Sequence, residues 1–188
     1  MAVKRKGLLA TFSIFNLIII AMCAGLGIAI KPIIVPLVHI VTGPLFIPGG
    51  AVAGGLYMLF IVVAAGLVGK TGAATLTCAV QAILVIISGV PGSAGILSLV
   101  TYIMPGVMVD LLFVIIRHKG CCAFCCFLAG LVANLTGTFL TNFVFFRLPF
   151  VPLMLTLFAA ALSGCLGGLI AWGVIKRLRV LNPVFKNG

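Results

Sequence analysis

Six long apolar stretches constrain this chain more than any other feature of its sequence. They lie at residues 7–30, 49–68, 71–89, 96–116, 121–145 and 150–175. Each approaches or exceeds the about 20 helical residues that cross the hydrocarbon core of a bilayer. Helices are expected because a β-barrel would show short alternating segments instead. The sequence predicts an all-α integral membrane protein, a single domain over residues 1–188 with six transmembrane helices in one compact bundle.

The charged residues indicate how these helices are oriented. Twelve of the 188 residues are Lys or Arg, only Asp110 is acidic, and 64% are hydrophobic. No basic stripe with interleaved aromatic residues accompanies the charge, so nucleic acid is not an expected partner. With a cytoplasmic N-terminus, ten basic residues face the cytoplasm and only Lys31 and Arg147 face outward. The positive-inside rule therefore predicts a multi-pass protein of the cell membrane with both termini cytoplasmic.

Two outer connections have unusual compositions. Residues 31–48 contain four prolines yet remain apolar, which predicts an irregular outer loop between the first two helices, folded as a lid or a re-entrant segment. Residues 88–95 (SGVPGSAG) are rich in glycine and uncharged, as in backbones that turn tightly or approach a ligand. Ordinary connectors are the alternative for both segments.

Polar side chains within the apolar stretches are the candidates for binding a small molecule. Each needs a hydrogen-bond partner that lipid does not provide, and each alone is explained by contact between helices. Together with the two outer connections, they predict a polar pocket that opens outward. The candidate substrate-binding residues are His39, Tyr57, Gln81, Thr101, Tyr102, Asn134, Thr138, Asn142 and Arg147.

Asp110 and a cysteine run have less certain roles in the sequence. Asp110 lies in the fourth stretch, where an ionisable group needs a partner, and it is either a local charge partner or a ligand contact. The CCxxCC run at 121–126 contains no histidine or acid that would complete four ligands, so no metal site is predicted. We interpret the run as small side chains at a helix start, with lipidation as the alternative.

Catalysis has little support in the sequence. Proteolysis within the membrane would need a serine–histidine pair or two aspartates, and the apolar stretches contain neither set. No P-loop is present, so any ATP hydrolysis would belong to partner subunits. The chain is therefore expected not to be an enzyme and to hold no cofactor of its own.

Several short motifs between Thr42 and Asp110 resemble a known family. The chain reads TGPLFIPGG, then GLVGKTGAA, SGVPGSAG and MPGVMVD. This series resembles the substrate-binding S components of energy-coupling factor (ECF) transporters, and among them the YkoE-like group associated with thiamine or its hydroxymethylpyrimidine precursor. The nickel and cobalt S components are disfavoured, because they resemble one another in a Met-His start and this chain begins Met-Ala-Val.

The resemblance implies a function and a set of partners. S components bind a vitamin or related micronutrient at the extracellular side of an ABC importer. They work with a transmembrane T subunit and two cytoplasmic ATPases, which use the ATP. The family's docking surface is a row of small residues on the first helix, which corresponds here to Ala21, Gly25 and Ala29. Small side chains at four-residue spacing allow helices to approach closely.

One departure from the family pattern concerns the ligand. The third stretch has no acidic residue to oppose a cationic thiazolium, and desolvating a cation without a carboxylate is costly. A neutral, aromatic or anionic ligand is therefore expected rather than thiamine. Lys31 and Arg147 at the outer face would suit a carboxylate or phosphate. A haem-like tetrapyrrole with His39 as ligand is a further alternative. A structural or regulatory membrane subunit that transports nothing is the competing functional class.

Overall fold

The computed structural model describes residues 12–45, 47–89, 96–117 and 122–181, and helices make up most of this part of the chain. The basic cluster near the N-terminus, residues 90–95 of the glycine-rich connection and Cys121 lie outside the described residues. In chain order the elements are α1 (Ile14–Thr42), the 3₁₀ turn η2 (Gly43–Leu45), α2 (Gly49–Val68), α3 (Ala73–Ser88), α4 (Ile96–Ile116), α5 (Ala123–Thr141), the π-helical turn η3 (Asn142–Phe146) and α6 (Phe150–Leu181).

Five of the described helical segments are long and apolar enough to cross a membrane. They are α1 with η2, α2, most of α4, α5 with η3, and α6. The remaining helix, α3, is apolar but has only 16 residues. It therefore rises about 24 Å, less than the about 30 Å of a typical hydrocarbon core. A sixth crossing by α3 stays a prediction, as does the orientation of the bundle.

The helix boundaries agree with the predicted stretches in most places. α2 and α4 have the predicted bounds, and α3 begins and ends within two residues of its prediction. α6 continues to Leu181, beyond the predicted end at residue 175. Its additional turns carry basic residues, and Arg179 Nη2 donates to the Gly66 carbonyl of α2 at 2.6 Å.

The predicted proline-rich outer loop is wrong over most of its length. α1 continues through Pro32 and Pro36 to Thr42, and only Pro44 and Pro48 lie outside it. Each internal proline removes one N–H donor and so releases one carbonyl four residues earlier. An irregular loop would expose far more backbone groups to an apolar environment. Continuing the helix is therefore the smaller cost for this apolar segment.

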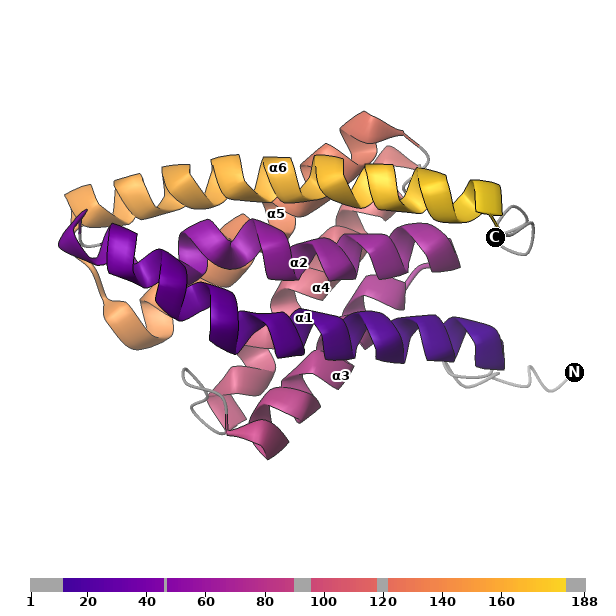
Figure 1. The fold of residues 1–188 in the computed structure, drawn as a ribbon, viewed down its shortest axis with the longest axis horizontal. Coiled ribbons are helices and arrows are strands. Elements are labelled where there is room, and N and C mark those ends of the chain that lie inside the picture. The colour runs from indigo at the N-terminus through magenta and orange to yellow at the C-terminus, as the bar shows by residue number, and fades with distance from the viewer. Residues whose placement is uncertain (1–11, 46, 90–95, 118–121, 182–188) are drawn as a thin grey trace, which may run out of the picture.

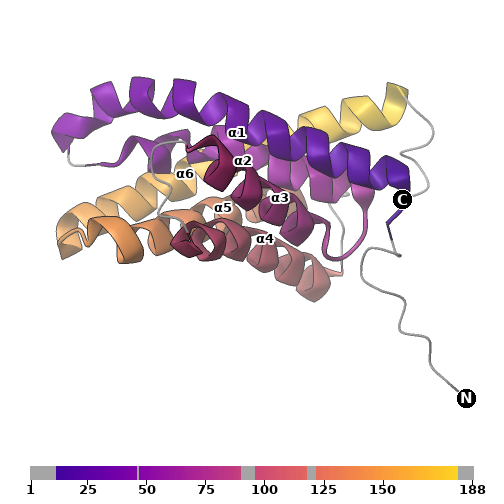
Figure 2. The same cartoon turned by 90° about the horizontal axis from the view of Figure 1, so that it is seen from below.

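α2 lies at the centre of the bundle and contacts α1, α3, α5 and α6 (Figure 1). In the most apolar 18 residues of α2, 78% of the residues are buried inside the molecule, against 28–39% in the same length of the other four spans. α3 and α4 pack against each other on one side of α2, and α6 runs along the opposite side (Figures 1 and 2). The start of α1 and the end of α6 lie at the same end of the bundle (Figure 1).

Glycine faces hold α6 against its two neighbours. A Cβ on Gly164 would lie 2.5 Å from the Gly130 carbonyl oxygen of α5, so these backbones touch directly. Gly55 of α2 also packs against α6, and its N–H donates to the Ser163 hydroxyl at 3.0 Å. These glycines of α2, α5 and α6 therefore serve packing inside the bundle.

Candidate ligand-binding cavity

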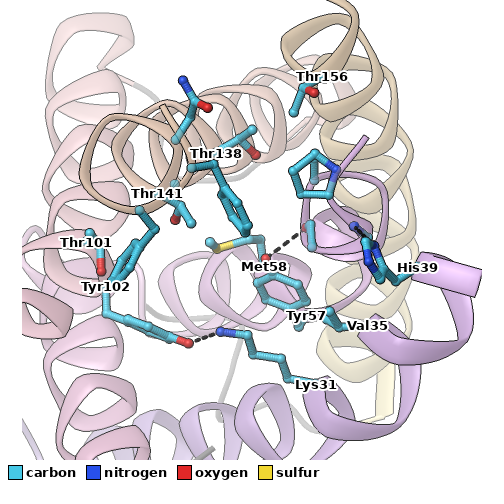
Figure 3. A pocket seen from close by; sticks show the side chains of 18 residues that line it. Lys31, Val35, His39, Tyr57, Met58, Thr101, Tyr102, Thr138, Thr141 and Thr156 are labelled. Atoms are coloured by element: carbon cyan, nitrogen blue, oxygen red, sulfur yellow. Dashed lines mark hydrogen bonds between the residues drawn. The ribbon is translucent and has the colours of Figure 1, made fainter. Parts of the chain in front are cut away.

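A cavity of about 280 Å³ lies at the end of the bundle where α1 ends and α6 begins, which we call the cavity end (Figure 3). Six elements contribute to its walls, and among the described residues α3 contributes none. The lining residues are Lys31, Val35, His39, Pro48, Gly49, Gly50, Ala51, Tyr57, Met58, Thr101, Tyr102, Gly137, Thr138, Thr141, Asn142, Phe145, Phe146 and Thr156.

Lys31 points from α1 into the cavity and not towards lipid. Its Nζ donates a hydrogen bond to the Tyr102 hydroxyl of α4 (Figure 3). The same atom lies 4.5 Å from the centroid of the Tyr102 ring and 5.6 Å from that of Tyr57. Aromatic ring faces attract a cation. Two tyrosines therefore surround the ammonium group, and no Asp or Glu is among the described lining residues.

Tyr57 presents its ring to the cavity because its hydroxyl is already engaged. The hydroxyl donates to the Gly50 carbonyl, in the first turn of α2, at 3.0 Å. Met58, Phe145 and Phe146 add further apolar surface. The walls thus combine aromatic surface with a few polar groups, as small-molecule sites commonly do.

His39 joins the last turns of α1 to the start of α2. Its Nδ1 accepts a hydrogen bond from the Gly49 N–H at 3.3 Å. A Cβ at Gly49 would lie 2.6 Å from the Val35 carbonyl oxygen, so only glycine allows this approach. Because Nδ1 is the acceptor, the neutral ring carries its proton on Nε2. The imidazole therefore offers a donor at Nε2 in this arrangement.

Thr156 of α6 is the most deeply buried polar residue of the cavity wall. Its side chain has no exposed surface, and its hydroxyl has no hydrogen-bond partner among the described residues. Such a group costs free energy until a partner is supplied. In Figure 3 it lies across the view from Lys31 and Tyr102.

The structure brings six of the nine predicted binding residues together around the cavity. They are His39, Tyr57, Thr101, Tyr102, Thr138 and Asn142. The Asn142 carboxamide oxygen is also engaged locally, since it accepts from the Leu148 N–H at 3.1 Å. Whether these side chains bind a substrate stays a prediction.

The other three predicted residues lie away from the cavity. Asn134 is fully buried and donates to the Ala51 and Ala160 carbonyls, at 2.9 and 2.8 Å. Gln81 is buried on α3, where its amide faces Gly27 of α1. Arg147 is exposed and follows the π-helical turn. Asn134 therefore joins helices by hydrogen bonds, whereas the buried Gln81 Nε2 has no hydrogen-bond partner among the described residues.

The sequence predicts no binding role for Thr141 or Thr156, and it indicates Lys31 only as an outer cation that, with Arg147, would suit a carboxylate or phosphate. Lys31 was assigned to the outer loop because two prolines follow it within five residues. Threonine in an apolar stretch is a weak signal, since its hydroxyl can bond the preceding turn. The signal that could have placed Lys31 within a span is that the sequence stays apolar after it, despite the prolines.

Comparison with known proteins identifies the family of this chain. Residues 11–136 match the family described as "ABC-type cobalt transport system, permease component". The chain belongs to this family. No match among curated proteins was found.

A solved structure shares the fold of this permease-family member. It is described as "Crystal structure of an S-component of ECF transporter", and it aligns with a TM-score of 0.74 over 89% of this chain and 85% of that chain. The two sequences are 20% identical, so the likeness shows the fold. The predicted S-component assignment is confirmed, and the YkoE-like group stays a prediction.

The small-residue row of this family member's α1 faces outward. Ala21 and Ala29 are exposed, and a Cβ on Gly25 would meet nothing within 4 Å. This row differs from the glycine faces of α5 and α6, which are filled by neighbouring helices. A flat face that no described residue covers is therefore present at the predicted docking positions.

Asp110 acts at the end opposite the cavity. Its carboxylate accepts from the Thr75 N–H and hydroxyl at 2.8 and 2.6 Å, and from the Ala74 N–H at 3.4 Å. These donors belong to the first turn of α3, which follows Gly72 and has no side-chain cap of its own. Asp110 is thus a partner for a helix N-terminus, where a negative charge is favourable.

The described cysteines of the CCxxCC run also form a helix start. Cys122 precedes α5, and its Sγ accepts from the Cys125 N–H at 3.3 Å. In the part of the chain that the structure describes, no group of three or more His, Cys, Asp or Glu side chains is placed to hold a metal ion. The role as small side chains at a helix start agrees with this geometry.

Proposed function

We propose that this chain is the substrate-binding subunit of an ECF-type importer, which captures a small organic micronutrient at the extracellular side. The cavity is the observation that carries the proposal. It is bordered by aromatic and hydroxyl side chains from elements that span most of the sequence. In this proposal the cavity end faces outward, in agreement with the positive-inside prediction.

The partners in this proposal are a transmembrane T subunit and two cytoplasmic ATPases. The outward-facing row at Ala21, Gly25 and Ala29 supports the first of them. Small residues allow a second helix to pack closely, and they make few polar contacts that would hinder release. The ATPases would use ATP, and this chain would supply recognition of the cargo.

A tetrapyrrole is a weaker alternative for the cargo than a smaller molecule. Axial ligation of haem by His39 through Nε2 needs a lone pair on that atom. The Gly49 N–H already binds Nδ1, which places the proton of the neutral ring on Nε2. The hydrogen bond would have to break before ligation. The cavity volume of about 280 Å³ also lies at the lower end of ligand pockets.

Three variants test the two halves of this function separately. Gly25→Trp should prevent co-purification with a co-expressed T subunit and ATPase pair, and should leave retention of a small molecule unchanged. Thr138→Trp fills the cavity from α5, so it should abolish retention of the small molecule and leave the complex intact. Gly173→Trp is the matched control for Gly25, because a Cβ there also meets nothing within 4 Å. Pull-down and native mass spectrometry in mild detergent measure both properties.

The outcomes separate transport from the competing class of structural subunit. A structural or regulatory subunit would retain no small molecule in the wild type and would be insensitive to Thr138→Trp. If Gly25→Trp or Thr138→Trp loses both the partner subunits and the small molecule, the variant has misfolded. The elution profile of the purified protein detects such misfolding. A wild type that binds neither T subunit nor small molecule contradicts the proposal.

A further inference from the structure

The ammonium group of Lys31 is a charge in the cavity wall that no opposite charge among the described residues balances. Charged groups at membrane depth are usually paired or in contact with water. A lysine near a helix end commonly extends its amine to the headgroup region. Lys31 instead reaches across the bundle to Tyr102, 71 residues away, and is half-buried there.

No acidic side chain is available to neutralise this ammonium group. The only acid in the sequence is Asp110, and its oxygens accept from the first turn of α3 at the other end of the bundle. The faces of Tyr57 and Tyr102 attract the cation without cancelling its charge. The cavity wall therefore carries a positive charge that an anionic cargo would neutralise.

The donors at this position suit an anionic oxygen group. The ammonium group has three N–H donors and uses one on the Tyr102 hydroxyl. A hydroxyl that accepts one hydrogen bond still has its own O–H to donate. Lys31 and Tyr102 can thus donate together to one oxyanion, and such charge-assisted bonds are strong.

We propose that Lys31 and Tyr102 form an anion-binding end of the cavity, and that the cargo is a small organic acid with an apolar or aromatic body. The body lies against Tyr57 and Met58, and the acidic group lies at Lys31. This inference rests on the proposed function and names the class of its cargo. It excludes a free divalent cation and thiamine, because either would meet the ammonium charge with no carboxylate to oppose it.

The test uses three probes with one skeleton and different charges: 3-phenylpropionate, 3-phenylpropionamide and 3-phenylpropylamine. Their binding to the purified protein is measured by isothermal titration in a neutral detergent at pH 7, beside Co²⁺ and thiamine. We expect the acid to bind at least tenfold more tightly than the amide. The amine, Co²⁺ and thiamine should bind more weakly than the amide.

Substitutions at Lys31 then assign the preference to this side chain. Lys31→Met keeps an unbranched apolar side chain one atom shorter than lysine, and it should remove the tenfold advantage of the acid over the amide. Lys31→Arg should preserve most of it, and Tyr102→Phe should reduce it. Lys176→Met is the matched control at the opposite end, where Nζ also lies over a ring, 5.2 Å from the centroid of Trp172. It should leave the preference unchanged.

Several results would overturn the inference. A cationic probe that binds more tightly than the acid would do so. The inference also fails if the wild type binds none of the three phenyl probes. An acid preference that persists in Lys31→Met would also contradict it. The titration is repeated with phosphatidylglycerol in the micelle: competition that disappears in Lys31→Met would assign the site to a lipid headgroup instead. The proposed function is judged independently, because the T-subunit pull-down does not depend on the charge of the cargo.

Discussion

Asn134 shows how one polar side chain can join three helices in a membrane protein. From α5 its amide nitrogen donates to carbonyls of α2 and α6, and its oxygen has no partner among the described residues. Gly54 gives this side chain its space, since a Cβ there would collide with the carboxamide. The residue therefore stabilises the centre of the bundle and does not reach the cavity.

Replacing Asn134 should lower stability without a specific loss of ligand. We expect Asn134→Leu to reduce the free energy of unfolding by about 1–2 kcal/mol, because two interhelical hydrogen bonds are lost. Thermal or mixed-micelle unfolding measures the change, with Asn16→Leu at a half-buried position of α1 as the control. An unchanged stability would mean that the two bonds contribute little in lipid.

At the scale of elements, α3 depends on a neighbouring helix for its N-terminus. Its first turn has no cap from Gly72, whose φ of 91° requires glycine, and Asp110 of α4 supplies the acceptors. The shortest helix of the bundle is thus held at one end by the single acid of the sequence.

Removing this carboxylate should weaken α3 in particular. We expect Asp110→Leu to cost about 1–3 kcal/mol of stability, since backbone N–H groups lose a charged acceptor. Hydrogen exchange should increase at Ala74 and Thr75 more than in α2. Thr75→Val removes only the hydroxyl bond and should have a smaller effect. If Asp110→Leu increases hydrogen exchange equally in α2 and α3, Asp110 supports the whole bundle and not this terminus in particular.

The elements also show what the sequence can and cannot predict. Hydropathy predicts the first and last residues of α2 and α4, because the apolar length of a spanning helix must match the thickness of the hydrocarbon core. It fails at α1, where prolines that end helices in water are tolerated in an apolar environment. That error placed Lys31 in an outer loop, whereas the structure has it within α1, at the cavity wall. The polar residues of α4 and α5 were identifiable because few polar groups interrupt those spans.

At the scale of the whole molecule, α2, α5 and α6 form a tightly packed unit. Gly130 and Gly164 bring α5 and α6 into backbone contact, and Gly55 does the same for α2 and α6. Leucine at Gly164 would have to separate two helices, whereas leucine at Gly173 would project into open space.

This difference predicts unequal effects of the same substitution on one helix. Gly164→Leu should lower the midpoint of thermal unfolding strongly, by the equivalent of about 1–3 kcal/mol or more, because overpacking forces backbone shifts. Gly173→Leu should change it little. Comparable midpoints for the two variants would show that α6 can move away from α5 at small cost.

The unequal lengths of the helices affect the surrounding lipid. α1 and α6 have 29 and 32 residues, well beyond the about 20 needed to cross, while α3 has 16. Ile83 and Ile87 of α3 are exposed, which gives a crossing α3 an apolar flank for acyl chains. If α3 crosses the bilayer as predicted, the bilayer must thin beside it and must thicken, or let the long helices tilt, on the other flank. The protein should therefore favour an inclined position in a flat membrane, and lipids with shorter tails should gather beside its short helix.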